Sequence, residues 1–303
     1  MLHRHLIRRL DLISLQLFLA VHEEGTLTKA AEREMIALSA ASKRLHEMEA
    51  LLGIEVFERN AKGMALTAAG ETLLYYAKRI LADVEKISID VGEHLEGVRG
   101  YVRMMANISA IIEFLPEDLQ GFIANHPLVK VNLDERPSAG VVQGVLDGVA
   151  DIGICSADTD VKGLHAVHYR QDQLVVLMRP DHPLAGRERL AFHETLPYEH
   201  VGLHSASFIN LRTQAAARSH GQPLKLRIHV PGFDAVCRMV QANLGLGVVP
   251  LKAFELFGKP LGLLAATLDD DWAERSLSLV TRDVAGLNPV SRLLYGHLRQ
   301  PSA

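Results

Sequence analysis

The sequence contains few cysteines and no excess of positive charge. Only two cysteines, Cys155 and Cys237, occur among 303 residues, and they are too far apart in the chain to form a C-x-x-C pair. This usage fits a reducing cytoplasm and provides neither a disulfide framework nor a zinc site. The net charge of −4 excludes binding to polyanions by bulk electrostatics, so any contact with nucleic acid must come from a local cluster of basic residues.

Motifs for catalysis, metal binding and cofactors are also missing from the sequence. It contains no G-x-S-x-G, no phosphate-binding loop and no G-x-G-x-x-G after a predicted strand, and its 15 histidines form no H-E-x-x-H. Residues 269–271 (DDD) are interpreted as a solvated loop, because nothing supplies the remaining ligands of a cation. We therefore predict a protein that is not an enzyme, with no catalytic residue, no metal site and no cofactor.

Residues 26–49 carry the pattern of two short helices joined by a tight corner. A threonine, Thr26 or Thr28, can cap the first helix, and the second helix begins at Ser39. Three apolar residues of the second helix share one face at helical spacing, namely Ala41, Leu45 and Met48.

The opposite face of the second helix combines hydroxyl and basic side chains. Small residues permit close approach to a DNA major groove, and bases and hydroxyls can reach phosphates or base edges. An ordinary amphipathic helix with a solvated polar face explains residues 26–49 equally well when they are taken alone. The predicted DNA contacts in these two helices are Thr28, Lys29, Ser39, Ser42, Lys43, Arg44 and His46.

Residues 54–57 and 64–66 are predicted to form two short strands around a basic turn. Arg59 and Lys62 would lie at the tip of this wing and contact the DNA backbone or the minor groove. Helix, turn, helix and wing in this order are much more specific than any one part. We therefore predict a winged helix-turn-helix DNA-binding domain at residues 11–67.

An apolar run at residues 12–21 follows several arginines, which is an arrangement shared with signal peptides. Asp11 and Gln16 interrupt this pattern, and no small-x-small cleavage site follows it. We interpret residues 11–24 as the first helix of the DNA-binding domain and expect a cytoplasmic protein with no membrane partner. The alternative is an exported solute-binding protein without DNA function, which would leave the first 66 residues unexplained.

A long helix is predicted over residues 68–97, with Thr67 as its cap. Its apolar residues repeat at intervals of four and three. So narrow a stripe favours a coiled-coil seam with a second subunit over a helix that lies on its own domain, since groove-binding helices normally work in pairs. The predicted dimerisation residues are Leu73, Ala77, Ile80, Val84, Ile87 and Val91.

From residue 98 onward the pattern alternates between strands and helices, which is typical of an α/β domain with parallel sheets. The predicted strands cover residues 101–107, 129–134, 151–155, 173–178, 201–203, 226–230, 247–249 and 275–281. The predicted helices cover residues 111–125, 138–147, 210–219, 233–243 and 289–298.

Seven short motifs, spread from residue 25 to residue 250, can be compared with known families. They are residues 25–32 (GTLTKAAE), 42–45 (SKRL), 56–59 (VFER), 66–70 (LTAAG), 148–154 (GVADIGI), 182–184 (HPL) and 245–250 (GLGVVP). Together they strongly resemble the LysR-type transcriptional regulators, over nearly the whole chain after Asp11. One departure lies at the start of the second helix, where Ala37-Leu38-Ser39 replaces the family's common Ser-Gln-Pro, so the common glutamine is absent.

This resemblance implies a periplasmic-binding-protein-like regulatory domain at residues 98–303, built from two Rossmann-like subdomains. Residues 100–169 with 272–298 would form the first subdomain, and residues 170–268 the second. The resemblance further implies that the chain binds double-stranded promoter DNA as a homodimer, and usually as a homotetramer, with RNA polymerase as a further candidate partner. A small-molecule effector would bind in the cleft between the subdomains.

Four loops at the ends of predicted strands, where helix N-termini point amides at a ligand, are expected to line this cleft. Serine hydroxyls and the Arg136 guanidinium suit a small organic anion, although each serine taken singly fits a plain helix cap better. Asp234, if it faced the cleft, would instead favour an amine or a hydroxyl-bearing ligand. The predicted effector contacts are Asn107, Ile108, Ser109, Arg136, Ser138, Ser205, Ser207, Phe208, Phe233 and Asp234.

Overall fold

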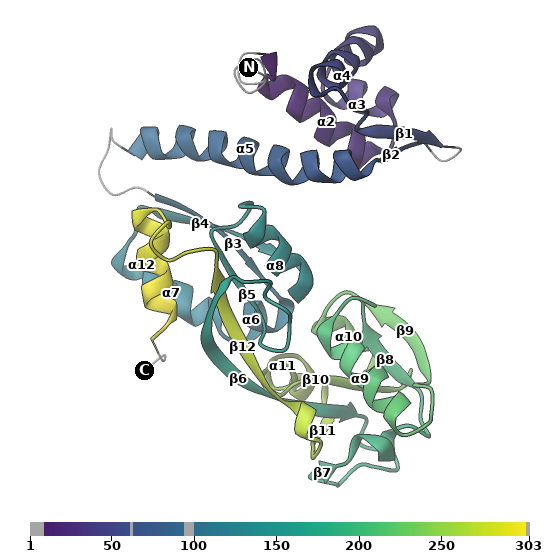
Figure 1. Cartoon of the computed structure of the whole chain (residues 1–303). Helices are drawn as coiled ribbons and strands as arrows, with labels where there is room; N and C mark the ends of the chain where they lie inside the picture. Colours follow the sequence, from purple (N-terminus) through teal and green to yellow (C-terminus); the bar gives the residue numbers. More distant parts are fainter. Residues whose placement is uncertain (1–8, 61–62, 94–99, 301–303) are drawn as a thin grey trace. The chain divides into compact units, whose positions relative to one another are not determined.

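The structure, a computed structural model, describes residues 9–60, 63–93 and 100–300 of the chain. The chain forms two compact units that meet in sequence near residue 97 (Figure 1). No helix in these described ranges is long and apolar enough to cross a membrane.

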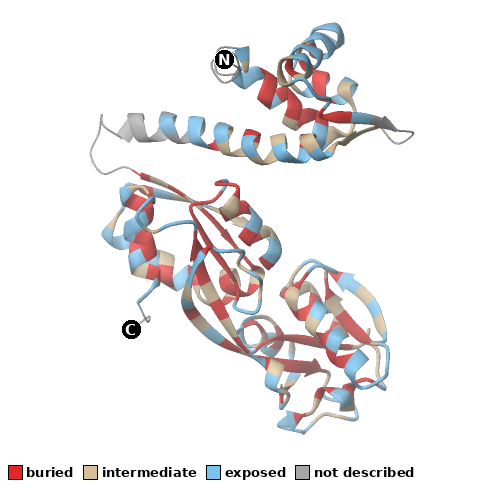
Figure 2. Ribbon diagram, in the orientation of Figure 1, coloured by how far each residue is buried: buried red, intermediate tan, exposed pale blue. Residues whose placement is uncertain are grey.

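Within its described residues, the first unit contains three short helices, a β-hairpin and one long helix. The helices are α2 (Leu12–Glu24), α3 (Leu27–Arg33), α4 (Leu38–Leu52) and α5 (Ala68–Glu93), and the hairpin consists of β1 (Phe57–Asn60) and β2 (Gly63–Leu66). The inward faces of α2 and α4 are buried (Figure 2), and the Phe18 ring packs 5.1 Å from the Phe57 ring, measured between centroids. The predicted buried face of Ala41, Leu45 and Met48 is confirmed.

Local capping fixes where α3 and α5 begin and where α4 ends, as the sequence predicted, although α4 begins at Leu38 rather than at the predicted Ser39. The Thr26 hydroxyl accepts a hydrogen bond from the Lys29 amide at 3.3 Å, and the Thr67 hydroxyl accepts one from the Gly70 amide at 3.0 Å. Gly53 ends α4 in the left-handed region at a φ of 72°.

The wing departs from its predicted position. Strand β1 begins at Phe57, whereas the sequence predicted a strand over residues 54–57. The reason is a contact with α4, because the Glu49 carboxylate accepts hydrogen bonds from the amides of Val56 at 3.0 Å and Phe57 at 3.4 Å. Arg59 consequently lies within β1 opposite Met64 rather than in the turn.

The second unit is built on one long mixed sheet, in the order β4-β3-β5-β12-β6-β10-β8-β9, with β11 paired to β6 and β7 paired to β11. The strands are β3 (Gly100–Ala106), β4 (Val129–Glu135), β5 (Ile152–Ser156), β6 (His165–Met178), β7 (Arg189–Leu190), β8 (His200–Leu203), β9 (Leu226–Val230), β10 (Leu246–Pro250), β11 (Leu264–Leu268) and β12 (Glu274–Thr281). Strands β3, β4 and β5 are parallel to one another, as are β8, β9 and β10.

Strand β6 differs most from the prediction, which placed a strand only at residues 173–178. Its first part pairs antiparallel with β12, and its last part, residues 174–178, pairs antiparallel with β10 and β11. The sequence pattern missed residues 165–172 because they are largely polar and half exposed. The all-parallel prediction was therefore wrong at β6 and β12.

Helices cover the sheet on both sides (Figure 1). They are α6 (Ile108–Glu113), α7 (Leu115–Asn125), α8 (Ser138–Leu146), α9 (Phe208–Ser219), α10 (Phe233–Gln241), α11 (Leu251–Ala253) and α12 (Pro289–Leu298). A single helix was predicted over residues 111–125, but the chain breaks at Phe114, whose φ is −135°, and Pro116 then sits in the first turn of α7.

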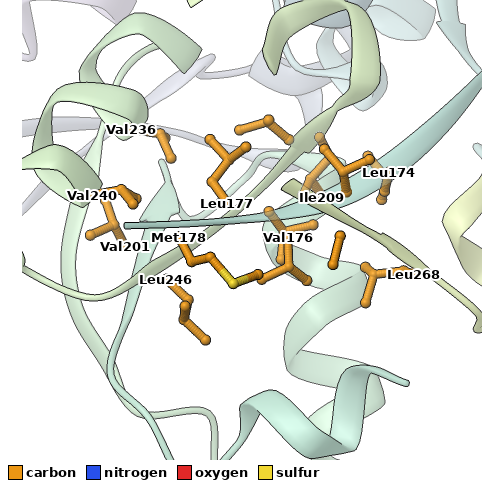
Figure 3. Close-up of a cluster of buried hydrophobic side chains, with 14 of the residues drawn as sticks. Leu174, Val176, Leu177, Met178, Val201, Ile209, Val236, Val240, Leu246 and Leu268 are labelled. Carbon is orange, nitrogen blue, oxygen red and sulfur yellow. The ribbon is translucent and has the colours of Figure 1, made fainter. Parts of the chain in front are cut away.

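The second unit has two lobes, each with its own apolar core. The first lobe contains β3, β4, β5, α6, α7, α8 and α12; the second contains β7 to β11, α9, α10 and α11. Figure 3 shows the second core, where residues 174–178 of β6 pack against Val201, Ile209, Val240 and Leu246. Strand β6 carries the chain from the first lobe to the second, and residues 269–273 return it to β12.

Candidate DNA-binding face and effector cleft

The polar face of α4 is exposed to solvent. Ser39, Ser42, Lys43 and His46 all lie on it, opposite the buried face that packs into the first unit. The Lys43 ammonium lies 3.9 Å from the Glu47 carboxylate, an exposed i,i+4 pair that holds it weakly. Thr28 and Lys29, in the first turn of α3, are also exposed.

The start of α4 has no side chain that accepts its free amides. Ala37 is the N-cap residue and has no polar side-chain atom, whereas α2 is capped by Asp11 and α3 by Thr26. The first amides of a helix point outward with a partial positive charge, which suits a phosphate oxygen.

Arg44 forms an ion pair within the first unit, with Asp11 at the start of α2. Its guanidinium donates to the Asp11 carboxylate at 3.2 Å and lies 3.5 Å from the Ser14 hydroxyl. Although burial opposes the shift, the Ser14 amide and the Arg44 charge lower the pKa of Asp11. Arg44 therefore ties α4 to the start of α2 through its Nη1 group.

The wing residues are described only in part. Arg59 is placed by its backbone in β1, and its side chain lies outside the described residues, as does the whole of Lys62.

The predicted stripe on α5 divides into two parts. Ala77 is fully buried, and Leu73 packs with it into the core of the first unit, so these two predicted dimerisation residues serve their own domain. Ile80, Val84 and Ile87 are exposed, and Ile87 keeps 61% of its surface. Tyr76, which the stripe did not include, is exposed beside them, and the side chain of Val91 lies outside the described residues.

A narrow, open cavity lies between the two lobes of the second unit. It brings together seven of the predicted effector contacts: Asn107, Ile108, Ser109, Arg136, Ser138, Ser207 and Phe208. Ser205, Phe233 and Asp234 are not among its lining residues. Ser205 and Asp234 are exposed elsewhere, and Phe233 is buried in the core of the second lobe.

Most of the polar side chains in the cavity already hold the loops together. The Asn107 carboxamide oxygen caps α6 by accepting from the Ala110 amide at 3.0 Å, and the Ser207 hydroxyl caps α9. The Ser138 hydroxyl accepts from the Asn107 carboxamide at 3.2 Å and from the Ser156 amide at 3.1 Å. The cap interpretation therefore holds for Ser207, and Ser138 joins β3, β5 and α8.

Arg275 is the buried cation of the cavity, and the sequence did not predict this role. Its guanidinium donates to the Asp172 carboxylate, through Nε at 2.7 Å and also through Nη2, and Nη2 donates to the Ser109 hydroxyl at 3.1 Å. Asp172 and Arg275 are direct partners in the β6–β12 ladder. Two opposite charges that face each other across a ladder would have indicated this pair. The sequence alone does not show that they face each other, because the register pairs two residues that are 103 positions apart in the chain.

Glu113 adds a second carboxyl group to this buried cluster. Its side chain is buried, and its Oε1 has no hydrogen-bond partner among the described residues. Burial, and next the negative charge of Asp172, raise the pKa of Glu113 to about 9, so the group is neutral near pH 7. The Lys252 ammonium of α11 donates to the Glu113 carbonyl oxygen at 3.0 Å, which links the second lobe to α6.

Arg136 lies at the rim of the cavity. Its side chain is 55% exposed, and its guanidinium is 3.8 Å from the Asp134 carboxylate. Within the described ranges, no group of three or more His, Cys, Asp or Glu side chains is arranged to hold a metal ion.

A DNA-binding head of helix, turn, helix and wing, followed by a two-lobed domain with a cavity between the lobes, defines the class of ligand-responsive transcriptional regulators. Residues 12–71 match the family model "Bacterial regulatory helix-turn-helix protein, lysR family". Residues 95–302 match the model "LysR substrate binding domain". The chain belongs to the LysR family of DNA-binding transcriptional regulators, which are not enzymes, and it carries the family's effector-binding domain.

Individual relatives agree with this assignment over most of the chain. An uncharacterised HTH-type transcriptional regulator of Escherichia coli K12, YbhD, is 24% identical and covers 95% of this chain and 90% of its own. The RuBisCO operon transcriptional regulator of Allochromatium vinosum is 27% identical and covers 93% of each chain. The crystal structure of full-length CbnR in complex with its target DNA shares the fold, with a TM-score of 0.70 at 21% identity over 96% of this chain and 99% of that one.

Proposed function

We propose that α4 enters the major groove of promoter DNA while α3 and the wing contact the backbone, and that a small organic anion in the cavity controls this binding. The exposed face of α4 carries the proposal, because it places hydroxyls and a base opposite a buried apolar face. The proposed DNA contacts are Thr28, Lys29, Ser39, Ser42, Lys43, His46, Arg59 and Lys62. Arg44 is left out because it is paired with Asp11.

The protein acts as a cytoplasmic homodimer, or as a homotetramer built from dimers. Support comes from Tyr76, Ile80, Val84 and Ile87, which form an exposed apolar strip at helical spacing along α5. Pairing two such helices would remove this strip from water and place two DNA-binding heads on two half-sites.

The effector binds between the lobes, close to Arg136 at the rim and to Arg275 and Ser109 at the base. Asp172 balances the charge of Arg275, so Arg136 supplies the positive charge that an anion would need. The effector controls DNA binding only if it binds one arrangement of the lobes more tightly than the other.

The docking of α4 is tested with Lys43→Ala, measured as affinity for promoter DNA over a range of salt concentrations. We expect weaker binding and a salt slope smaller by about one phosphate contact. Lys259→Ala, an exposed lysine in the second unit, is the matched control and should change neither quantity. Equal affinity and equal slope for wild type and Lys43→Ala would contradict the docking.

A further inference from the structure

Leu38 is an exposed leucine at the first position of α4. Its side chain keeps 48% of its surface, and the next residue of the same exposed face, Ser42, lies one turn further along the helix. Leu38 stabilises its own domain only through the half of its surface that is buried, because only apolar surface removed from water contributes to stability. The other half is free to contact a partner.

The whole entry into α4 lacks hydrogen-bonding side chains. Met35 is 93% exposed in the turn, Ala37 is the N-cap residue, and Leu38 follows directly, so Ser39 is the first side chain that can donate or accept. In a helix-turn-helix protein the N-terminal residues of the second helix contact base edges. Before Ser39, side chains can therefore distinguish base edges only through apolar contact.

We infer that Leu38 reads thymine by packing against its 5-methyl group in the major groove, and so determines part of the operator sequence. The thymine methyl is the one apolar group that base pairs display in that groove, and aliphatic side chains are its usual partners. This inference rests on the proposed docking of α4.

The test begins by selecting bound duplexes from random-sequence DNA with the purified full-length protein. Each thymine of a selected duplex is then replaced singly by deoxyuridine, which removes only the methyl group. Wild type should bind about 3- to 5-fold more weakly at one or two positions, the effect of one buried methyl. Leu38→Ala should bind the parent duplex more weakly and lose this sensitivity at the same positions.

Two further variants separate the inference from a general loss of structure. Ile54→Ala removes an apolar side chain that is 55% exposed just beyond the C-terminal end of α4, and it should keep the full response to deoxyuridine. Leu38→Gln should shift the selected base at that position from thymine toward adenine, because a carboxamide pairs with adenine N6 and N7.

The outcomes distinguish failure of the inference from failure of the docking. Equal deoxyuridine sensitivity in wild type and Leu38→Ala, or no sensitivity in wild type, overturns the role of Leu38 while Lys43→Ala can still confirm the docking. If Lys43→Ala also leaves affinity and salt slope unchanged, α4 is not the reading helix and both proposals are wrong. Melting temperatures of all variants should stay close to wild type, since these side chains are exposed.

Discussion

Arg275 and Asp172 show how much a single pair of residues can decide in this domain. Both side chains are almost fully buried, and removing one partner from such a pair typically costs about 3–5 kcal/mol because the other charge is left without compensation. The pair holds the Arg275 guanidinium in one orientation, from which it donates to Ser109 at the start of α6. A strand, a helix and the base of the cavity are thus positioned by one ion pair.

Glu113, beside this pair, makes stability depend on pH. Its pKa of about 9 in the folded chain lies above the 4.5 of an unfolded chain, because burial disfavours the charged form. The unfolded chain therefore loses its proton first as the pH rises. Stability from this group is fully present below pH 4.5 and is lost progressively as the pH rises toward 9.

Glu113→Gln should remove this dependence, since glutamine is neutral throughout. We expect the variant to gain several degrees of melting temperature relative to wild type at pH 8, and much less at pH 5. Thermal unfolding of the two proteins at both pH values measures the difference. Glu255→Gln, at an exposed position of the second lobe, serves as the control and should show no such trend. A gain of the same size at pH 5 and pH 8 would contradict the assignment.

At the scale of elements, α5 performs two tasks along one helix. Its first turns pack Leu73 and Ala77 into the first unit, and its later turns expose Ile80, Val84 and Ile87. The repeat at four and three positions predicted an apolar stripe correctly. It could not divide the stripe, because the periodicity of a helix reports which residues share a face and not what covers that face.

The exposed half of this stripe yields a prediction about assembly. Replacing Ile80 and Ile87 together by aspartate should convert the proposed homodimer to monomers at micromolar concentration, because each charge would enter an apolar seam. Light scattering coupled to gel filtration gives the mass directly. Glu71→Gln, on the opposite face of α5, should leave the mass unchanged. A double variant that keeps the mass of wild type would show that the dimer forms through another surface.

The sequence predicted other elements correctly where local interactions alone decide the secondary structure. Caps and glycines placed α2, α3 and α4 to within a residue or two, and apolar runs found most strands of the second unit. The predicted end of the long helix, at residue 97, lies outside the described residues. The exceptions have tertiary causes. Glu49 holds residues 56 and 57 against α4, so β1 begins later than predicted, and β6 continues through polar residues because β12 pairs with it.

At the scale of the whole molecule, a ligand can control the second unit only if it binds one arrangement of the two lobes more tightly than another. Each lobe has its own core, and the cavity between them is lined from both sides. A ligand held from both sides would change how the lobes close, as in hinged binding domains.

The proposed anion is tested by titrating monocarboxylates and dicarboxylates while following thermal stability. At least one should raise the melting temperature of wild type, and Arg136→Ala should weaken that binding about 5- to 10-fold, the loss of one charged contact in a partly exposed site. Arg227→Ala, an exposed arginine of β9, should bind like wild type. No response to any carboxylate, together with an unchanged Arg136→Ala, would rule out an organic anion held by Arg136.

The sequence by itself determined the class of this protein, its family and most of its elements, because caps, glycines and apolar periodicity act over a few residues. It also found seven residues of the cavity, since they follow the ends of strands. Only the tertiary structure decided the roles of Arg44, Ala77 and Arg275. Each of these depends on a segment distant in sequence: Asp11 for Arg44, the core of the first unit for Ala77, and Asp172 for Arg275. Such partners are set by packing and strand register, which no local pattern of residues encodes.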